Sequence, residues 1–224
     1  KFWQEISNDI FWFKKPSKIL NKSNPPFYKW FEDGITNTCY NALDVHIDQG
    51  RGDKIALIYD SPITNSKKQF TYKELKEKVS KFAGALQNQG INKGDRVIIY
   101  MPMIPEAVIA MLACGRIGAI HSVVFGGFAS NELASRIDDS KAKVIVTASC
   151  GFEPGRTVEY KPLVDAAIKM AAHKIEKMIL FQRTGHEVSL NPPKEISWEE
   201  SLSNAKEVDC VEMRSNEFAY ILYT

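Results

Sequence analysis

A regular alternation of apolar, strand-like runs with helix-like segments between residues 96 and 182 constrains this chain most. Strands are expected at 96–101, 119–125, 143–148 and 177–182, with helices at 105–118, 130–140 and 161–173. Such alternation is typical of βαβ crossovers, which join parallel strands. The strands are Val- and Ile-rich without polar alternation, so we expect helices on both faces of the sheet. The sequence therefore predicts an α/β fold with a mainly parallel sheet.

Two further regions complete the expected organisation. A short strand is expected at 54–60, followed by a helix that starts after Thr71 and closes at Gly90, because Thr71 and Glu74 form a capping box. Residues 183–198 read as a loop. Residues 1–50 are rich in aromatic side chains, and we expect short helices and a loop whose rings anchor them to a larger body. The predicted division is an extension over 1–50 and an α/β portion over 51–224.

Composition excludes several classes of function. The chain has 224 residues with 29 Lys plus Arg against 27 Asp plus Glu, and this balance argues against nucleic acid or an anionic membrane as a partner. Four widely separated cysteines without a CxxC pair indicate a reduced compartment and no structural zinc. No membrane-length apolar run or signal peptide is present, so we expect the cytoplasm, or the mitochondrial matrix if a presequence was removed.

Ligands of open α/β sheets bind beyond the carboxyl ends of the strands, so the turns there are candidate sites. The first is Phe-Gly-Gly-Phe at 125–128, where glycine N–H groups approach a ligand and the Phe125 and Phe128 rings offer faces for a flat group such as adenine. Ser130 could cap the next helix. The alternative is that Gly126 and Gly127 only turn the chain and both rings belong to the core.

The second candidate turn is Cys-Gly-Phe-Glu-Pro-Gly-Arg at 150–156. The planar fork of Arg156 matches phosphate oxygens, and Lys161 follows nearby. The alternative is an exposed Arg156 paired with Glu153 or Glu159. His121, inside an apolar strand, reads as a satisfied core residue. No Ser/His/Asp order, HExxH or GxxxxGK[ST] motif occurs, so neither a catalytic residue nor a metal ligand is assigned.

Three segments, 28–47, 71–148 and 153–167, resemble the amino-terminal part of AMP-forming acetyl-CoA and propionyl-CoA synthetases, which belong to the adenylate-forming superfamily. The resemblance covers essentially the whole chain. It implies the adenylate-forming fold and an acid-thiol ligase that uses ATP, CoA and Mg²⁺. In such enzymes a short-chain carboxylate and MgATP give acyl-AMP and pyrophosphate, and the sulfur of CoA then displaces AMP.

The resemblance also implies a set of binding residues. Phe125 and Gly126 would pack on the adenine of CoA, while a second group would line the nucleotide phosphate: Glu153, Pro154, Gly155 and Arg156. Acetyl-CoA synthetases commonly read Arg-Gly-Gly-Arg at this segment. The form found here resembles the propionyl-CoA synthetase branch and favours propionate over acetate as the acid.

The chain ends on the apolar run Asn-Glu-Phe-Ala-Tyr-Ile-Leu-Tyr-Thr, which predicts a fragment. In the resembled family this run is followed by a phosphate loop, an acyl pocket and a small carboxy-terminal domain with a catalytic lysine. The fragment would thus contribute scaffold and part of the CoA site, and would be inactive without the carboxy-terminal part of its own chain. The alternative is a non-catalytic α/β binding or interaction module that docks through the aromatic arm.

Overall fold

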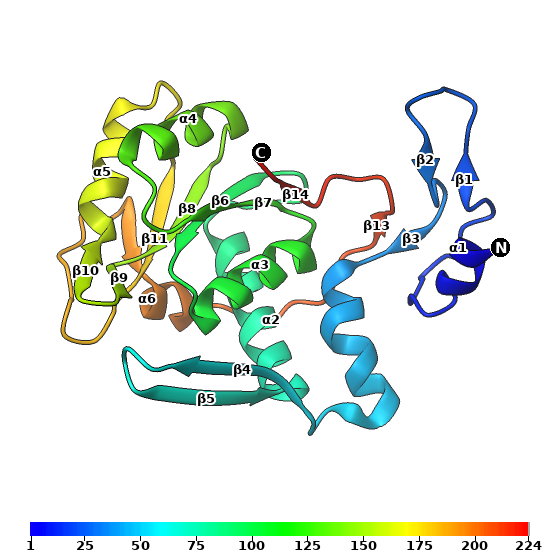
Figure 1. The fold of residues 1–224 in the computed structure, drawn as a ribbon, viewed down its shortest axis with the longest axis horizontal. Helices are drawn as coiled ribbons and strands as arrows, with labels where there is room; N and C mark the ends of the chain where they lie inside the picture. The colour runs from blue at the N-terminus through cyan, green and yellow to red at the C-terminus, as the bar shows by residue number, and fades with distance from the viewer. Residues whose placement is uncertain (224) are drawn as a thin grey trace.

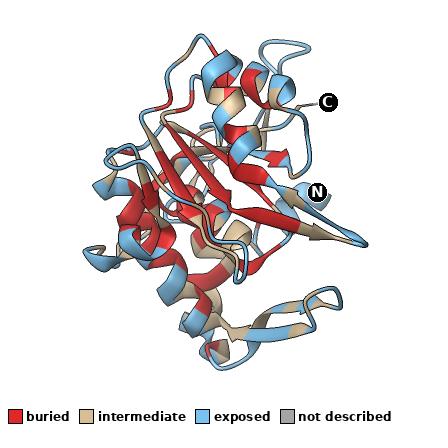
Figure 2. Ribbon diagram, turned by 90° about the vertical axis from the view of Figure 1, so that its left-hand side faces the viewer, coloured by how far each residue is buried: buried red, intermediate tan, exposed pale blue. Residues whose placement is uncertain are grey.

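The computed structural model describes residues 1–223 and is built on a six-stranded sheet in the order β12-β11-β8-β6-β7-β14 (Figure 1). Every pair of neighbouring strands in it is parallel. Figure 2 shows the central strands of this sheet to be largely buried. The predicted α/β class with a mainly parallel sheet is therefore confirmed. The six strands are β6 (Arg96–Met101), β7 (Ile120–Phe125), β8 (Val144–Ala148), β11 (Lys177–Phe181), β12 (Glu195–Ser197) and β14 (Tyr220–Ile221).

Helices cover both faces of the sheet, as expected. On one side α3 (Pro105–Ile117) packs on β6 and β7, and α6 (Trp198–Ser203) packs on β11 and on α2 (Tyr72–Asn88). On the other side α4 (Ser130–Ser140) and α5 (Tyr160–Met170) pack together, with α5 against β8 (Figure 1). The cover is incomplete at β7, where Val123 is 46% exposed and Phe125 is 68% exposed. A strip of the sheet near β7 and β14 thus stays open.

The predicted helix at the capping box is α2, and its amino terminus is confirmed in detail. The Thr71 hydroxyl accepts from the Glu74 N–H at 3.2 Å, and the Glu74 carboxylate accepts from the Thr71 N–H at 2.8 Å. Together these bonds satisfy two backbone donors that the first turn of a helix leaves unpaired. The α2 ring of Phe82 stacks on Trp198 of α6 at 3.8 Å, which joins this helix to the core.

Several strands of the α/β portion were not expected from the sequence. Residues 66–71 form β5 (Ser66–Thr71), the antiparallel partner of β4 (Ile55–Ser61). The second candidate turn is itself a hairpin of β9 (Cys150–Glu153) and β10 (Arg156–Glu159). The segment read as a loop contains β12, where Ile196 is buried against the sheet.

The amino-terminal arm lies at the side of the sheet (Figure 1, blue) and packs largely on itself. Trp3 meets Trp30 at 5.4 Å and Phe11 meets Tyr40 at 4.6 Å between ring centroids. Phe27 is 74% exposed, so the expectation that the rings act as packing anchors does not hold for all of them. The arm comprises α1 (Phe2–Ile6), β1 (Leu20–Asn21), β2 (Lys29–Trp30), β3 (Ile35–Thr36) and the π-helical turns η1 (Tyr40–Asp44) and η2 (Ile47–Arg51).

Polar contacts attach this arm to the body. The buried Asn37 side chain donates to the carbonyl oxygens of Gly115 and Val211, each at 2.9 Å. The short strand β13 (Met213–Arg214) pairs antiparallel with β3. The arm is therefore attached to the body through residues that lie far from it in the sequence. Across residues 1–223, no helix has both the length and the apolar character that a membrane span requires.

Candidate functional site

A cavity of about 350 Å³ lies beyond the carboxyl ends of β6 and β7. It brings together three of the residues expected to bind CoA, namely Phe125, Gly126 and Glu153. Its lining also includes Gly151, Phe152, Tyr160 and Arg183. The first candidate turn and part of the second thus meet at one edge of the sheet, where ligands of open α/β sheets bind.

The Phe-Gly-Gly-Phe turn is held by a buried tyrosine of the neighbouring strand. The Tyr100 hydroxyl donates to the Phe128 carbonyl at 2.8 Å and accepts from the Gly127 N–H at 3.3 Å. Gly127 has a φ of 110°, a conformation that side chains disfavour. Both phenylalanine rings are exposed, so the alternative that they belong to the core is wrong. The Phe125 ring is available to a ligand.

Tyr160, the first residue of α5, packs against this turn at Gly126. A Cβ atom added to Gly126 would lie 2.1 Å from the Tyr160 Oη, and one added to Gly151 would lie 2.6 Å from it. Both positions therefore require glycine, because any side chain there would collide with the Tyr160 hydroxyl. Burial raises the pKa of Tyr160 to about 12, so its hydroxyl stays protonated at neutral pH.

The second candidate turn is the tip of the β9–β10 hairpin. Pro154 and Gly155 form the turn, and Gly155 has a φ of 76°. Arg156 is directly opposite Glu153 and donates from its Nε to the Glu153 Oε2 at 2.7 Å. The side chain of Arg156 is 70% exposed and borders a different, shallow cavity that Glu159 also lines. The alternative of an exposed, carboxylate-paired arginine is what the structure shows.

Two neighbouring expectations need correction. Lys161 does not stand free beside Arg156, because it is buried and donates to Asp165 at 2.6 Å and to Glu195 at 3.2 Å. Ser130 does not cap α4, because the N-cap position is Ala129 and Ser130 is already the first helical residue. Neither side chain contributes to the cavity.

Arg183 is a site residue that the sequence analysis did not single out. It lies just after β11, at the same edge of the sheet as the two candidate turns. Its position after a predicted strand could have identified it, since the turn after every parallel strand is a candidate ligand-binding position. The sequence predicts only a loop over 183–198, and the cavity lining adds Arg183 to the site.

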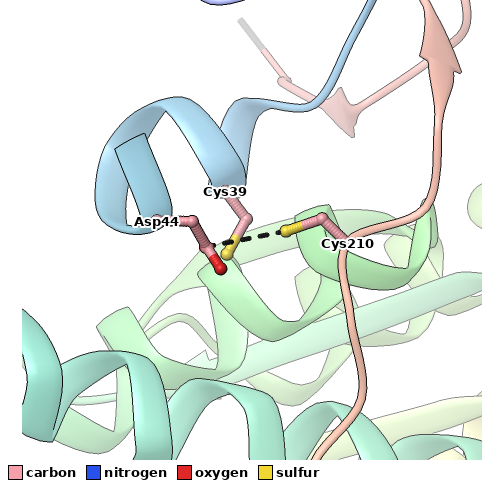
Figure 3. A group of neighbouring side chains, drawn as sticks. All are labelled: Cys39, Asp44 and Cys210. Atoms are coloured by element: carbon pink, nitrogen blue, oxygen red, sulfur yellow. Dashed lines mark hydrogen bonds between the residues drawn. The ribbon is translucent and has the colours of Figure 1, made fainter. Parts of the chain in front are cut away.

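A group formed by the buried Cys39 and Asp44 and the half-buried Cys210 is the arrangement in residues 1–223 that most resembles a metal site (Figure 3). Its ligand atoms lie within 4.8 Å of one another. The Arg116 Nη1 lies 2.8 Å from Asp44, 3.1 Å from Cys210 and 3.6 Å from Cys39. The Arg116 guanidinium therefore occupies the position between these side chains that a metal ion would take. The pKa of the Cys39 thiol is lowered by a hydrogen bond from Cys210 and by the Arg116 charge.

His121 lies on the open strip of the sheet. Burial lowers its pKa to about 4, so the imidazole is neutral at physiological pH. Its Nδ1 has no hydrogen-bond partner among residues 1–223, which corrects the expectation of a satisfied core residue. The ring lines an apolar cavity of about 610 Å³ between α3 and β14, with Tyr220 at 5.9 Å. Nothing in these contacts equips it for proton transfer.

Two family models match the chain, and curated proteins resemble it over its whole length. The model described as AMP-binding enzyme matches residues 44–224, and the one described as acetyl-coenzyme A synthetase N-terminus matches residues 1–42. Acyl-CoA synthetase short-chain family member 3, mitochondrial, from Homo sapiens is 54% identical over 225 residues. Acetyl-coenzyme A synthetase from Streptomyces coelicolor is 45% identical over 224 residues. Each alignment covers 100% of this chain but only 33% and 34% of the relative, respectively, so the chain spans about a third of their length.

A solved structure has the same fold. Acetoacetyl-CoA synthetase from Streptomyces lividans matches with a TM-score of 0.87 and 23% identity, covering 100% of this chain and 34% of that one. The expected adenylate-forming fold and the resemblance to short-chain acyl-CoA synthetases are both confirmed. Because one family model spans residues 44–224, this chain belongs to the AMP-binding enzyme family.

Proposed function

We propose that this chain works as the amino-terminal portion of a short-chain acyl-CoA synthetase. The complete enzyme would join a short-chain carboxylate to AMP with release of pyrophosphate, and then transfer the acyl group to the sulfur of CoA. The names and identities of the relatives support this assignment. The observation that carries the chain's own role is the convergence of Phe125, Gly126 and Glu153 on one cavity.

The cavity fits the adenine end of CoA. The exposed ring of Phe125 presents a flat apolar face, and Gly127, where an added Cβ would meet only the Glu153 Oε1 at 3.7 Å, leaves room for a base to approach the backbone. Tyr100 holds the turn, so the ring is positioned before the ligand arrives. In this proposal Phe125 and Gly126 pack on the adenine, while Glu153, Pro154, Gly155 and Arg156 of the neighbouring hairpin line the nucleotide phosphate.

ATP and Mg²⁺ would bind mainly outside these residues. ATP would supply the adenylyl group, and Mg²⁺ would neutralise charge on its phosphates. In the described part of the chain, the one group of metal-ligand side chains encloses Arg116 and does not suit Mg²⁺, which prefers oxygen ligands. The chain's own contribution is therefore scaffold and CoA binding, and it would be inactive alone.

Finer assignments belong to the same proposal. The Glu153-Pro154-Gly155-Arg156 segment favours propionate as the preferred acid. The extension over 1–50 and the α/β portion over 51–224 remain the proposed division. The human relative is named as a mitochondrial protein, which favours the mitochondrial matrix over the cytoplasm. The alternative of a non-catalytic interaction module is not favoured. The relatives carry the names of enzymes, and their alignments cover the whole of this chain.

A titration of CoA into the complete protein tests the proposed site. Phe125→Ala should weaken CoA binding about 10-fold, because stacking of a base on an aromatic ring contributes about 1–3 kcal/mol. Phe27→Ala removes an equally exposed ring from the distant arm and should leave the affinity unchanged. Equal effects of the two substitutions, or none, would remove Phe125 from the CoA site.

A further inference from the structure

Arg183 is fixed at the edge of the sheet by its backbone. Its N–H donates to the Oγ of the buried Ser149 at 2.8 Å, which ties it to the start of the β9–β10 hairpin. Its side chain lines the cavity that contains Phe125 and Gly126. It also lines an adjoining cavity of about 570 Å³. The guanidinium thus belongs to the wall shared by two cavities at the carboxyl edge of the sheet.

Two other basic groups near the site are engaged by carboxylates, whereas Lys68, which lines the adjoining cavity with Arg183, forms no salt bridge among residues 1–223. Arg156 is bound to Glu153 at 2.7 Å, and Lys161 is bound by two acidic side chains. Salt-bridged arginines in residues 1–223 are Arg116, Arg136 and Arg156. Arg183 is not among them and forms no salt bridge within that range, although its charge acts on the Glu106 carboxyl group, which also lines the adjoining cavity. The Glu153 charge, in turn, is balanced by Arg156 and does not cancel that of Arg183.

An aromatic ring orients the Arg183 guanidinium. The Cζ of Arg183 lies 4.7 Å from the centroid of the Phe152 ring. A cation–π contact of this kind attracts the face of the guanidinium and leaves its N–H donors at the edge for other partners. Phe152 is itself held in the hairpin, where it pairs with Thr157. A planar set of donors is therefore presented beside the cavity by a rigid support.

We propose that Arg183 is a phosphate-binding residue of this cavity, donating to a phosphate of CoA while Phe125 packs on the adenine. The inference rests on the proposed CoA site and adds to it a residue that the family resemblance did not supply. A nucleotide with a flat base and phosphate groups matches a cavity that combines an exposed ring with a planar cationic fork. Arg156 then serves chiefly to neutralise Glu153.

Calorimetric titration of the complete protein tests this role. Arg183→Ala should weaken CoA binding about 10- to 100-fold, the loss typical of a charge-assisted hydrogen bond to phosphate. Arg183→Lys keeps the charge without the fork and should give an intermediate loss. Arg214→Ala, which removes an exposed arginine on β13, should bind CoA as wild type does. Circular dichroism confirms that each variant is folded, and the lysine variant serves if the alanine variant does not fold.

The choice of ligand locates the contact. A loss with CoA but not with 3′-dephospho-CoA assigns Arg183 to the 3′-phosphate, whereas equal losses with both assign it to the diphosphate; either result supports the proposal. Unchanged CoA affinity in folded Arg183→Ala, or an equal loss of ATP affinity, would overturn it while leaving the CoA site in place. Failure of the wild-type protein to bind CoA would instead overturn the proposed function itself.

Discussion

The loss of stability caused by Gly126→Ala can be predicted from the distances around Gly126. The new Cβ would lie 2.1 Å from the Tyr160 Oη and 3.1 Å from the Met101 carbonyl oxygen, where ordinary contact begins at 3.4 Å. Tyr160 is 3% exposed and packs 4.9 Å from the Tyr100 ring, so it cannot swing aside into solvent. The turn must move by about 1 Å or more, which costs about 1–3 kcal/mol of stability, the range found for overpacked cores.

The displaced turn carries Phe125 with it, so CoA affinity should fall together with stability. Tyr160→Phe removes the hydroxyl responsible for the closest contact, leaving the ring carbon at 2.8 Å. In that background Gly126→Ala should therefore cost less, with a coupling of about 0.5–3 kcal/mol between the two sites. Urea unfolding of the four proteins gives the free energies, and CoA titration gives the affinities. A cost for Gly126→Ala that is absent, or unchanged by Tyr160→Phe, would refute the reasoning.

Three further predictions concern stability. Arg116→Met leaves Asp44 buried without its bidentate partner and should cost about 3–5 kcal/mol in urea unfolding, most of it recovered by adding Asp44→Leu; a harmless single substitution would contradict this. Thr71→Ala removes the cap of α2 and should cost about 1 kcal/mol, while Thr71→Ser should cost less; equal losses would argue against the capping bond. For His121 the folded pKa of about 4 lies below the ordinary 6.5, so the unfolded state binds the proton first and stability should fall as pH drops through that window. His121→Phe should flatten this dependence in thermal unfolding measured against pH.

Hydrophobic pattern was sufficient to predict the central sheet. The run at 96–101 is β6 to the residue, and the strand expected at 54–60 is observed at 55–61. β6 is apolar because it is buried in the central sheet, whereas β4 lies in a separate two-stranded sheet with Ile55 and Ile58 exposed. By contrast β5 reads Ser-Lys-Lys-Gln-Phe-Thr and is mostly exposed, so its only strand signal is its pairing with β4. That pairing is a tertiary contact and does not appear in local periodicity.

Sequence reasoning located the site better than it assigned the charges there. Phe125, Gly126 and Glu153 meet because the carboxyl ends of β7 and β8, the two strands that flank β6, lie at one edge of the sheet. The ion pair between Glu153 and Arg156 depends on a hairpin register that the sequence did not predict. Arg183 reaches the same edge because β11 lies beside β8, and strand order cannot be deduced from the alternation of elements alone.

The most direct test of the proposed synthetase function is to measure AMP formation by the complete protein. Acetate, propionate and butyrate are compared in parallel, each with and without CoA. We predict AMP release that requires both ATP and CoA and is fastest with propionate. Faster turnover of acetate would retain the synthetase and discard the branch inferred from Glu153-Pro154-Gly155-Arg156. An absence of AMP formation with all three acids would contradict the proposed function.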